Sequence, residues 1–441
     1  MTSPAAASHR HQSGDGNHPG ATAPMANRRN MMKRAMTVAS VAVLGLALAA
    51  CRGTGATGAT GGSDDGSLKI MQLTIPKTNG LDYQAGVKAA VDAINAKGGI
   101  DGHKIDYEFC SDGPAPVGDP NSTANCAAKA VQEGVTALVG SLMVFSDSAY
   151  PTLARADIPA ISALGYSTPD NNNPLSYVMG SGYTNVAGEG MVSAQLGCKK
   201  AGIISQDGLP TDPEIVGSFA AGVKLGGGQV ADPVLVPEGT LDFNSSVAKL
   251  KSEGVDCITD GFPATAQLQP ILQAAHAAGG LKVVGPLDLL SDQTMKTLGP
   301  LAEGYVAVDS AFANAPADQN DTSVMNADQK QMMADLQKYA PEVVDTGRQA
   351  WIGYGAVKIY EAAAKKVLDA GEKVTSKSLK AALDTVQIPD SIWPALDFSQ
   401  PGPGKASRVF NTKVNFFVVK NGKITAIDRE AHDVGQAIKD F

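Results

Sequence analysis

Two apolar runs of this 441-residue chain, Val135–Gly140 and Ile158–Ser162, end in short segments rich in hydroxyl and aromatic side chains. The segments contain Ser141, Phe145, Ser146, Gly165 and Tyr166. Helices that begin after such segments present unpaired N–H groups, which bind polar or anionic groups of a ligand. These residue types therefore predict non-covalent binding of a small molecule. The alternative is structural: Ser146 caps a helix and Phe145 lies in the core.

Motifs of catalysis and metal binding are absent from the sequence. The histidines after residue 50 are His103, His276 and His432, and none has the spacing of a metal site. There is no GxSxG nucleophile turn, no GxxxxGK[ST] phosphate loop and no GxGxxG that opens a helix. A secreted enzyme that uses scattered carboxylates is the alternative. We predict no enzyme, no metal and no cofactor.

The elements that must position these residues alternate between strands and helices. Leu68–Thr74 is an apolar strand, and the segment after Gly86 carries apolar residues at helical spacing until Gly98-Gly99, which ends the helix. Lys104–Phe109 then alternates as a strand does. This βαβ rhythm, which continues to about residue 306, predicts an α/β protein with parallel sheets and ligands at the carboxyl ends of strands.

The C-terminal third departs from that rhythm. Ala327–Tyr339 and Gln349–Ala370 are predicted helices, and Asn421-Gly422 predicts a hairpin turn between two strands. The chain is long enough for two domains. Its formal net charge of −8 argues against nucleic-acid binding, which relies on basic residues that neutralise phosphates.

The N-terminus predicts export. Residues 1–50 combine a disordered extension, a basic segment and the apolar run Val38–Ala50, which is too short to span a bilayer and typical of a signal peptide. Leu48-Ala49-Ala50-Cys51 resembles the bacterial lipoprotein box, so Cys51 is expected to carry the lipid and residues 51–67 to form a flexible tether. The alternative is an ordinary signal peptide with a cysteine there by chance.

Four cysteines remain after Cys51, namely Cys110, Cys126, Cys198 and Cys257. Outside the cytoplasm an even number favours disulfides. The first two lie at the end of a predicted strand and the start of the next helix, and the last two each precede an apolar strand. Free buried thiols or a metal site are the alternatives, and the connectivity stays open.

Several blocks of the sequence resemble the type I periplasmic binding proteins of ABC importers, of the branched-chain amino-acid (Leu/Ile/Val) kind. The blocks are Ile94–Ile105, Gly134–Gly140 with Ser146, Ile158–Ser162, Ala350–Val357 and Asn421–Lys423. The resemblance implies two doubly wound parallel-sheet lobes joined by a hinge of three crossovers. The crossovers are expected near Gly182–Asn185, Asp309–Asn314 and Ser391–Leu396. Lobe 1 is then residues 68–183 plus 310–392, and lobe 2 is residues 184–309 plus 393–441.

The resemblance also implies which residues contact the ligand. From lobe 1 these are Tyr83, Ser141, Phe145, Ser146, Gly165 and Tyr166, and from lobe 2 Asn185, Asp207, Phe262 and Asp288. Two departures concern specificity: Gly208-Leu209-Pro210 replaces a Tyr-Gly pair of amino-acid binders, and the acid for an α-ammonium aligns at Leu287 or Asp288. Apolar residues beside the lobe 1 positions favour an apolar or aromatic ligand body. They are Leu142, Met143, Val144, Phe145, Leu164 and Tyr166.

The expected function is that of a solute-binding lipoprotein on the outer face of the bacterial cell membrane. It would capture an amino acid or an apolar, carboxylate-like solute between its lobes and deliver it to the permease and ATPase of an ABC importer. We expect a monomer held at the membrane by its lipid alone. The alternative is a binding protein that uses the same cleft to signal to a membrane receptor.

Overall fold

The computed structural model describes residues 66–76, 82–114, 118–208, 212–261, 266–310, 325–343, 348–428 and 430–440. All of them lie in one compact unit, Gly58–Phe441. The predicted signal peptide, Cys51, the tether up to residue 65 and Phe262 lie outside the described residues.

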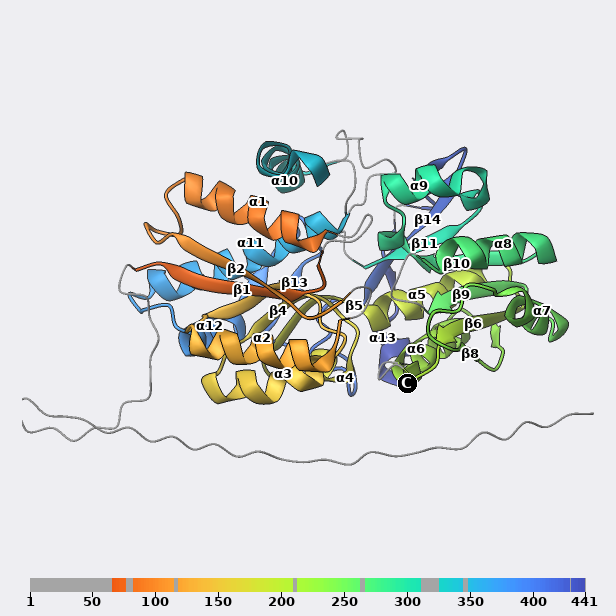
Figure 1. The fold of residues 1–441 in the computed structure, drawn as a ribbon, viewed down its shortest axis with the longest axis horizontal. Helices are drawn as coiled ribbons and strands as arrows, with labels where there is room; N and C mark the ends of the chain where they lie inside the picture. Colours follow the sequence, from red (N-terminus) through yellow and green to blue (C-terminus); the bar gives the residue numbers. More distant parts are fainter. Residues whose placement is uncertain are drawn as a thin grey trace, which may run out of the picture. The chain divides into compact units, whose positions relative to one another are not determined.

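The first sheet is parallel throughout and has the strand order β2-β1-β3-β4-β5 (Figure 1). Its strands are β1 (Leu68–Thr74), β2 (Ile105–Ser111), β3 (Ala137–Ser141), β4 (Ala160–Gly165) and β5 (Ser176–Ser181). Helices α1 (Tyr83–Ala96), α10 (Ala327–Tyr339), α11 (Arg348–Asp369) and α12 (Ser376–Leu383) share one buried cluster with it. Helices α2 (Pro120–Gln132) and α3 (Ser146–Leu153) cover the other face, and α4 (Thr168–Asn172) follows β4.

The second sheet is mixed, with the order β15-β14-β11-β10-β9-β6-β7. Its parallel strands are β6 (Lys200–Gln206), β7 (Gln229–Val230), β8 (Val234–Val236), β9 (Cys257–Gly261), β10 (Lys282–Pro286) and β11 (Val306–Asp309). The antiparallel strands are β14 (Lys413–Lys420), β15 (Lys423–Ala426) and β16 (His432–Asp433). The predicted α/β class with parallel-sheet lobes is confirmed, and the finding to add is the antiparallel edge of the second sheet.

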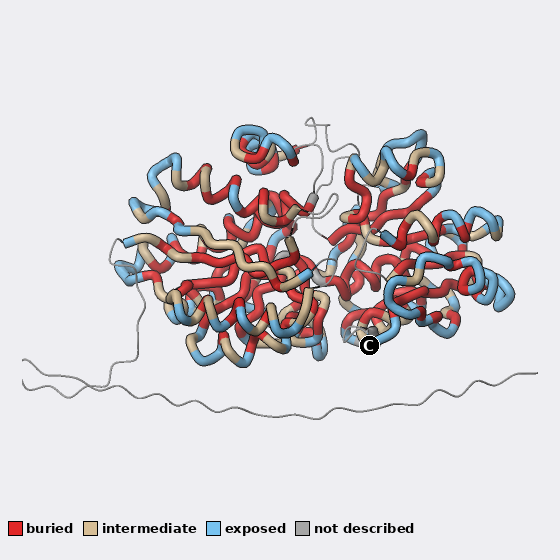
Figure 2. The backbone as a smooth tube through the Cα atoms, in the orientation of Figure 1, coloured by how far each residue is buried: buried red, intermediate tan, exposed pale blue. Residues whose placement is uncertain are grey.

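The helices of the second sheet also cover both of its faces. They are α5 (Gly182–Gln195), α6 (Asp212–Leu225), α7 (Asn244–Ser252), α8 (Leu268–Ala278), α9 (Asp292–Leu298) and α13 (Gly435–Asp440). Helices α7 and α8 pack on one face, and α5, α6 and α13 pack on the other. Figure 2 shows the strands of both sheets largely buried, with exposed residues on the outer sides of the helices.

Local sequence signals explain where α1 starts and stops. The Asp82 side chain accepts a hydrogen bond from the Ala85 N–H and caps the helix five residues before Val87, where the predicted apolar stripe begins. The stripe itself is buried as predicted. Gly98 and Gly99 have φ values of +109° and +89°, which favour glycine, and the Gly99 N–H donates to the Ile94 carbonyl oxygen at 3.0 Å. The predicted helix stop is therefore confirmed.

Both cysteine pairs form disulfides, Cys110–Cys126 and Cys198–Cys257, each with 5.8 Å between the Cα atoms. The first joins the end of β2 to α2. The second joins the segment before β6 to the start of β9, which is its neighbour in the sheet. The expectation of disulfides is confirmed.

The segment after residue 390 stays with the first sheet longer than expected. Strand β12 (Gln387–Ile388) pairs with β13 (Leu396–Asp397), and Trp393, Leu396 and Phe398 belong to the buried cluster of the first sheet. The sequence analysis assigned them to lobe 2 because an apolar segment does not reveal which of two cores buries it. The lobe boundaries as a whole stay a prediction.

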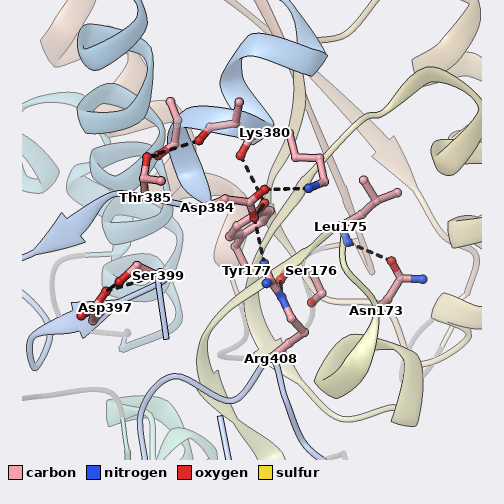
Figure 3. A network of polar contacts seen from close by, with 12 residues as sticks. Asn173, Leu175, Ser176, Tyr177, Lys380, Asp384, Thr385, Asp397, Ser399 and Arg408 are labelled. Carbon is pink, nitrogen blue, oxygen red and sulfur yellow. Dashed lines mark hydrogen bonds and ion pairs between the residues drawn. The ribbon is translucent and has the colours of Figure 1, made fainter. Parts of the chain in front are cut away.

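Arg408 holds the next part of the chain against the first sheet (Figure 3). Its Nε donates to the Ser176 carbonyl oxygen at 2.6 Å, and its backbone N–H donates to the Asn171 carbonyl oxygen at 2.9 Å. The guanidinium carbon lies 4.4 Å from the ring centre of Tyr177 and 4.8 Å from that of Phe410, within cation–π range. Arg408 therefore ties the segment that leads to β14 to the edge strand β5.

Gly86 provides a test of how closely α1 and α11 approach. A Cβ atom on Gly86 would overlap the carbonyl oxygen of Ala350, which is backbone and cannot move aside. We expect Gly86→Val to lower the free energy of unfolding by about 2 kcal/mol or more, because overpacking forces the helices apart. Denaturant unfolding measures this change. Lys88→Ala, on the exposed side of α1, is the control and should change it by less than about 0.5 kcal/mol. Equal stability of the two variants would contradict the close approach.

Candidate functional site

The carboxyl ends of parallel strands in both sheets carry most of the predicted ligand residues. In the first sheet β3 ends at Ser141 and β4 at Gly165, and in the second sheet β10 is followed by Asp288 and β11 ends at Asp309. Ligands of open α/β sheets bind at this edge of the strands. Some side chains there form hydrogen bonds within one lobe and so stabilise the fold. Others come from different lobes and lie near one another.

Ser141 and Ser146 are both fully buried and engaged within the first lobe. The Ser141 hydroxyl oxygen accepts a hydrogen bond from the Leu73 N–H at 3.0 Å. The Ser146 hydroxyl is hydrogen-bonded to that of Ser167, and Ser167 caps α4. Burial raises the pKa of Asp170 beside them to about 6, although hydrogen bonds from Ser167 and Tyr150 oppose the shift. The Ser141 hydroxyl thus joins β3 to β1, and the Ser146 hydroxyl joins α3 to the cap of α4.

The aromatic residues of the first lobe are better placed to meet a ligand. Phe145 is partly exposed and precedes α3, and Tyr166 is partly exposed after β4. The Tyr166 ring occupies the space where a Cβ of Gly182 would stand, and it packs against the buried clusters of both sheets. A Cβ atom at Gly165 would stand 3.0 Å from the Val178 side chain, which would have to give way slightly. Met143 is buried in the cluster under α2 and α3, so it does not line a pocket.

Tyr83, Tyr166 and Asp288 are brought close to one another across the two sheets. Burial raises the pKa of Tyr83 well above its ordinary value, and the charges of Asp288 and Asp309 raise it further. The pKa of Tyr166 is raised by burial first and then by Asp288 and Tyr83. Charges that shift a pKa in this way lie near enough to the group to interact with it electrostatically. Three predicted ligand residues therefore converge, together with Asp309.

Gln349 completes this group, and the sequence analysis did not select it. It is buried at the start of α11, and its side-chain Nε2 donates a hydrogen bond to the backbone oxygen of Asp288. Because α11 packs on the first sheet and Asp288 follows β10 of the second, this bond crosses between the lobes. The sequence signal that could have identified Gln349 is its position just before the Ala350–Val357 block.

The other residues predicted in lobe 2 have different surroundings. Asn185 is buried, and its Oδ1 accepts a hydrogen bond from the Ser310 N–H at 2.8 Å. The Asn411 side chain donates to the Ser310 carbonyl oxygen, and the Thr184 hydroxyl donates to the Asn411 carbonyl oxygen at 3.0 Å. Asn185 thus helps to bind three crossing segments together. Asp207 is exposed at the end of β6.

Two buried acids, Glu189 and Asp260, were missed. Glu189 is fully buried on α5, and burial, then the charges of Asp260 and Asp288, raise its pKa. Burial and Asp288 raise the pKa of Asp260 to about 7, and neither of its buried carboxylate oxygens has a hydrogen-bond partner. Asp260 could have been selected as an acid in an apolar strand, but no local pattern indicated that Glu189 lies near it.

Thr259 indicates the protonation state of Glu189. Its Oγ lies 2.6 Å from Glu189 Oε2 and 2.8 Å from the Val284 carbonyl oxygen. A hydroxyl has one hydrogen and can donate to only one of these two acceptors. Both contacts become hydrogen bonds if Glu189 is protonated and donates to Thr259, which then donates to Val284. This geometry agrees with the raised pKa of Glu189, so we treat this residue as neutral.

Within the described ranges no cluster of His, Cys, Asp and Glu has the arrangement of a metal site. In that same part of the chain no helix is both long and apolar enough to cross a membrane.

The fold and the converging residues define a two-lobed α/β solute-binding protein. The chain belongs to the family described as "Periplasmic binding protein", which matches residues 75–423. It is therefore an exported solute-binding protein of the kind used in ABC-type transport, and not an enzyme. The resemblance seen in the sequence is confirmed.

Named relatives agree with this assignment. The Leu/Ile/Val-binding protein of Escherichia coli (strain K12) is 27% identical over 319 residues, which cover 69% of this chain and 79% of the relative. The leucine-specific-binding protein of Salmonella typhimurium (strain LT2) is 25% identical over 321 residues, or 68% of this chain and 79% of the relative.

Solved structures share the fold at lower identity. A solute-binding protein of an ABC transporter from R. palustris in complex with benzoate has a TM-score of 0.67 at 18% identity, covering 83% of this chain and 98% of that one. LivJ from Streptococcus pneumoniae in complex with isoleucine has a TM-score of 0.66 at 19% identity, covering 83% and 99%.

Asp260 predicts a pH dependence of stability. Its pKa is about 7 in the folded chain, against an ordinary value of 3.8. Above pH 4 the unfolded chain therefore releases this proton while the folded chain still holds it, and this lowers the free energy of unfolding. Asp260 therefore weakens the fold increasingly between pH 4 and pH 7. We expect Asp260→Asn to be nearly neutral at pH 4 and to raise the free energy of unfolding at pH 8, by about 4 kcal/mol at most.

Denaturant unfolding at the two pH values measures this difference. Asp106→Asn replaces an exposed acid and is the matched control. An Asp260→Asn effect that is the same at both pH values would show that this carboxyl group is not buried as a neutral acid.

Proposed function

We propose that this protein binds a small solute with an amino group between its lobes and delivers it to an ABC permease. The observation that carries the proposal is the convergence of Asp288 and Asp309 with Tyr83 and Tyr166. The strongest charge effects on these two tyrosines come from acids, not from lysine or arginine. The negative charge of these carboxylates attracts the ammonium group of a ligand.

The same electrostatics favour an amino acid over a simple carboxylate such as benzoate. A ligand with only a negative charge would meet the field of Asp288 and Asp309 without compensation. An amino acid presents an ammonium group to the acids, and tyrosine faces attract cations as well. Its carboxylate is then available to N–H donors after β3 and β4. Phe145 and Tyr166, which are partly exposed, offer apolar surface to the rest of the ligand.

Capture between lobes requires contacts to both. Tyr83, Tyr166 and Gln349 come from elements of the first lobe, and Asp288 and Asp309 from the second. A solute that touches both groups stabilises the state in which they are close, and this is how binding drives closure of a hinged protein. Delivery to the permease then acts on the closed, loaded form.

Asp288→Asn tests the proposed ammonium contact. Leucine is expected to raise the melting temperature of the wild-type protein, and 4-methylpentanoate, which has the same carbon skeleton without the amino group, is not. Asp288→Asn should weaken leucine binding at least tenfold, because losing one partner of a buried charge pair costs more than about 1.4 kcal/mol. Calorimetric titration measures both affinities.

Asp232→Asn is the control for this experiment, since Asp232 is an exposed acid of the same lobe. A larger thermal shift with benzoate and 4-hydroxybenzoate than with the branched-chain amino acids would reject an amine ligand. Unchanged leucine affinity in Asp288→Asn would reject Asp288 as its partner.

We also propose that Cys51 carries a lipid that holds the protein at the membrane, where tethering raises its concentration near the permease. We expect the wild-type protein in the membrane fraction of the cell and Cys51→Ser in the soluble fraction or the medium. Fractionation followed by immunodetection measures the distribution, with Thr54→Ser as the control. Membrane retention of Cys51→Ser would contradict lipid anchoring through this residue.

A further inference from the structure

A cavity of about 290 Å³ has a lining of its own, separate in its residues from the group around Asp288. Its lining includes Thr168, Asn171, Tyr183, Glu214, Lys405 and Ile438, and none of these belongs to the group of Tyr83, Tyr166, Asp288, Asp309 and Gln349. The volume is close to the lower limit of about 300 Å³ for small-molecule pockets. An occupant would therefore be smaller than a drug-sized ligand.

The walls of this cavity come from both lobes. Thr168 and Asn171 lie on α4, next to the first sheet, whereas Glu214 lies on α6 and Ile438 on α13, which pack on the second. Tyr183 is in the first turn of α5, where the chain crosses between the sheets. Lys405 belongs to the segment that Arg408 ties to β5 (Figure 3). A rotation of one lobe against the other therefore changes the distance between the walls.

Glu214 is the chemically distinctive residue of the cavity. Its Oε1 accepts a hydrogen bond from the Thr168 hydroxyl at 2.5 Å, a contact that joins the two lobes. Its Oε2 is buried and has no hydrogen-bond partner. A buried carboxylate oxygen is costly to leave without a donor, so the geometry of the cavity calls for an N–H donor at this point. Lys405 is exposed at the rim and forms no ion pair with another described residue.

We propose that this cavity is a second binding site, for a small zwitterion whose ammonium group donates to Glu214 Oε2. The apolar part of the molecule lies against Ile438 and Ala406, which are buried in the lining. The Lys405 ammonium at the rim favours a molecule that also carries a carboxylate over a simple amine. The site does not depend on the ligand proposed for the region around Asp288.

Occupancy of this cavity is coupled to solute binding at Asp288. A molecule that contacts Glu214 and the α4 side of the cavity has different contacts in different lobe arrangements, and it therefore shifts the equilibrium between them. Linkage requires the effect to be reciprocal: each ligand changes the affinity of the other by the same factor.

The test uses the complete exported protein and three molecules of similar size: 4-aminobutyrate, butylamine and butyrate. Calorimetric titration is expected to give the affinity order 4-aminobutyrate, then butylamine, then butyrate. Glu214→Gln keeps an oxygen that can accept from Thr168 but removes the charge. We expect it to weaken 4-aminobutyrate binding at least tenfold, both in the wild-type background and in Asp288→Asn.

The second background separates this site from the one around Asp288. If Asp288→Asn alone abolishes 4-aminobutyrate binding, or if Glu214→Gln leaves it unchanged, the molecule binds elsewhere and the inference is wrong. A change in leucine affinity on saturation with 4-aminobutyrate, present in the wild-type protein and absent in Glu214→Gln, supports the coupling, and no change rejects it. Circular dichroism and the melting temperature of Glu214→Gln confirm that this variant folds.

Discussion

The architecture depends on the hydrogen-bond partners of the backbone N–H and carbonyl groups where the chain passes between its two sheets. At Ser310 the N–H donates to Asn185 and the carbonyl oxygen accepts from Asn411, while Thr184 donates to the Asn411 carbonyl oxygen. These backbone groups are buried and lie outside any strand ladder, so side-chain amides and a hydroxyl must replace the missing partners. The result is that three crossing segments lie against one another and can act as one hinge.

This constraint decides which polar residues remain for a ligand. The family resemblance implied that Asn185 contacts the ligand, but its side-chain oxygen accepts a hydrogen bond from the Ser310 N–H where the chain crosses between the sheets. Ser141 and Ser146 are likewise engaged with the backbone of β1 and with the α4 cap. The groups that meet across the lobes are Tyr83, Tyr166, Gln349 and the acids after β10 and β11. The proposed solute contacts therefore fall on side chains that come from both lobes.

The sequence predicted the fold better than the site, for a physical reason. Periodicity and turn residues are local, so Leu68–Thr74 and Ala327–Tyr339 were predicted at their observed bounds, and Asn421-Gly422 adopts the positive φ values of a type I′ turn. Strand β5 was missed because Ser176–Ser181 mixes small, aromatic and polar residues without alternation. Contacts such as that of Gln349 with Asp288 join residues far apart in the chain, and no local pattern encodes them.

Among the acids near the proposed ammonium contact, Glu189 and Asp260 are poorer candidates than Asp288. Both hydrogen bonds of the Thr259 hydroxyl, to Glu189 and to the Val284 carbonyl oxygen, form only if Glu189 is protonated. Asp260, with a pKa of about 7, carries only part of a charge near neutral pH. Burial and the negative charge of Asp288 favour the protonated form of both acids. Bringing a cation next to Asp288 would relax that field and make ionisation of Asp260 easier. Solute binding at Asp288 should therefore release a fraction of a proton from the acids beneath it, because their charge and the ligand's charge are coupled.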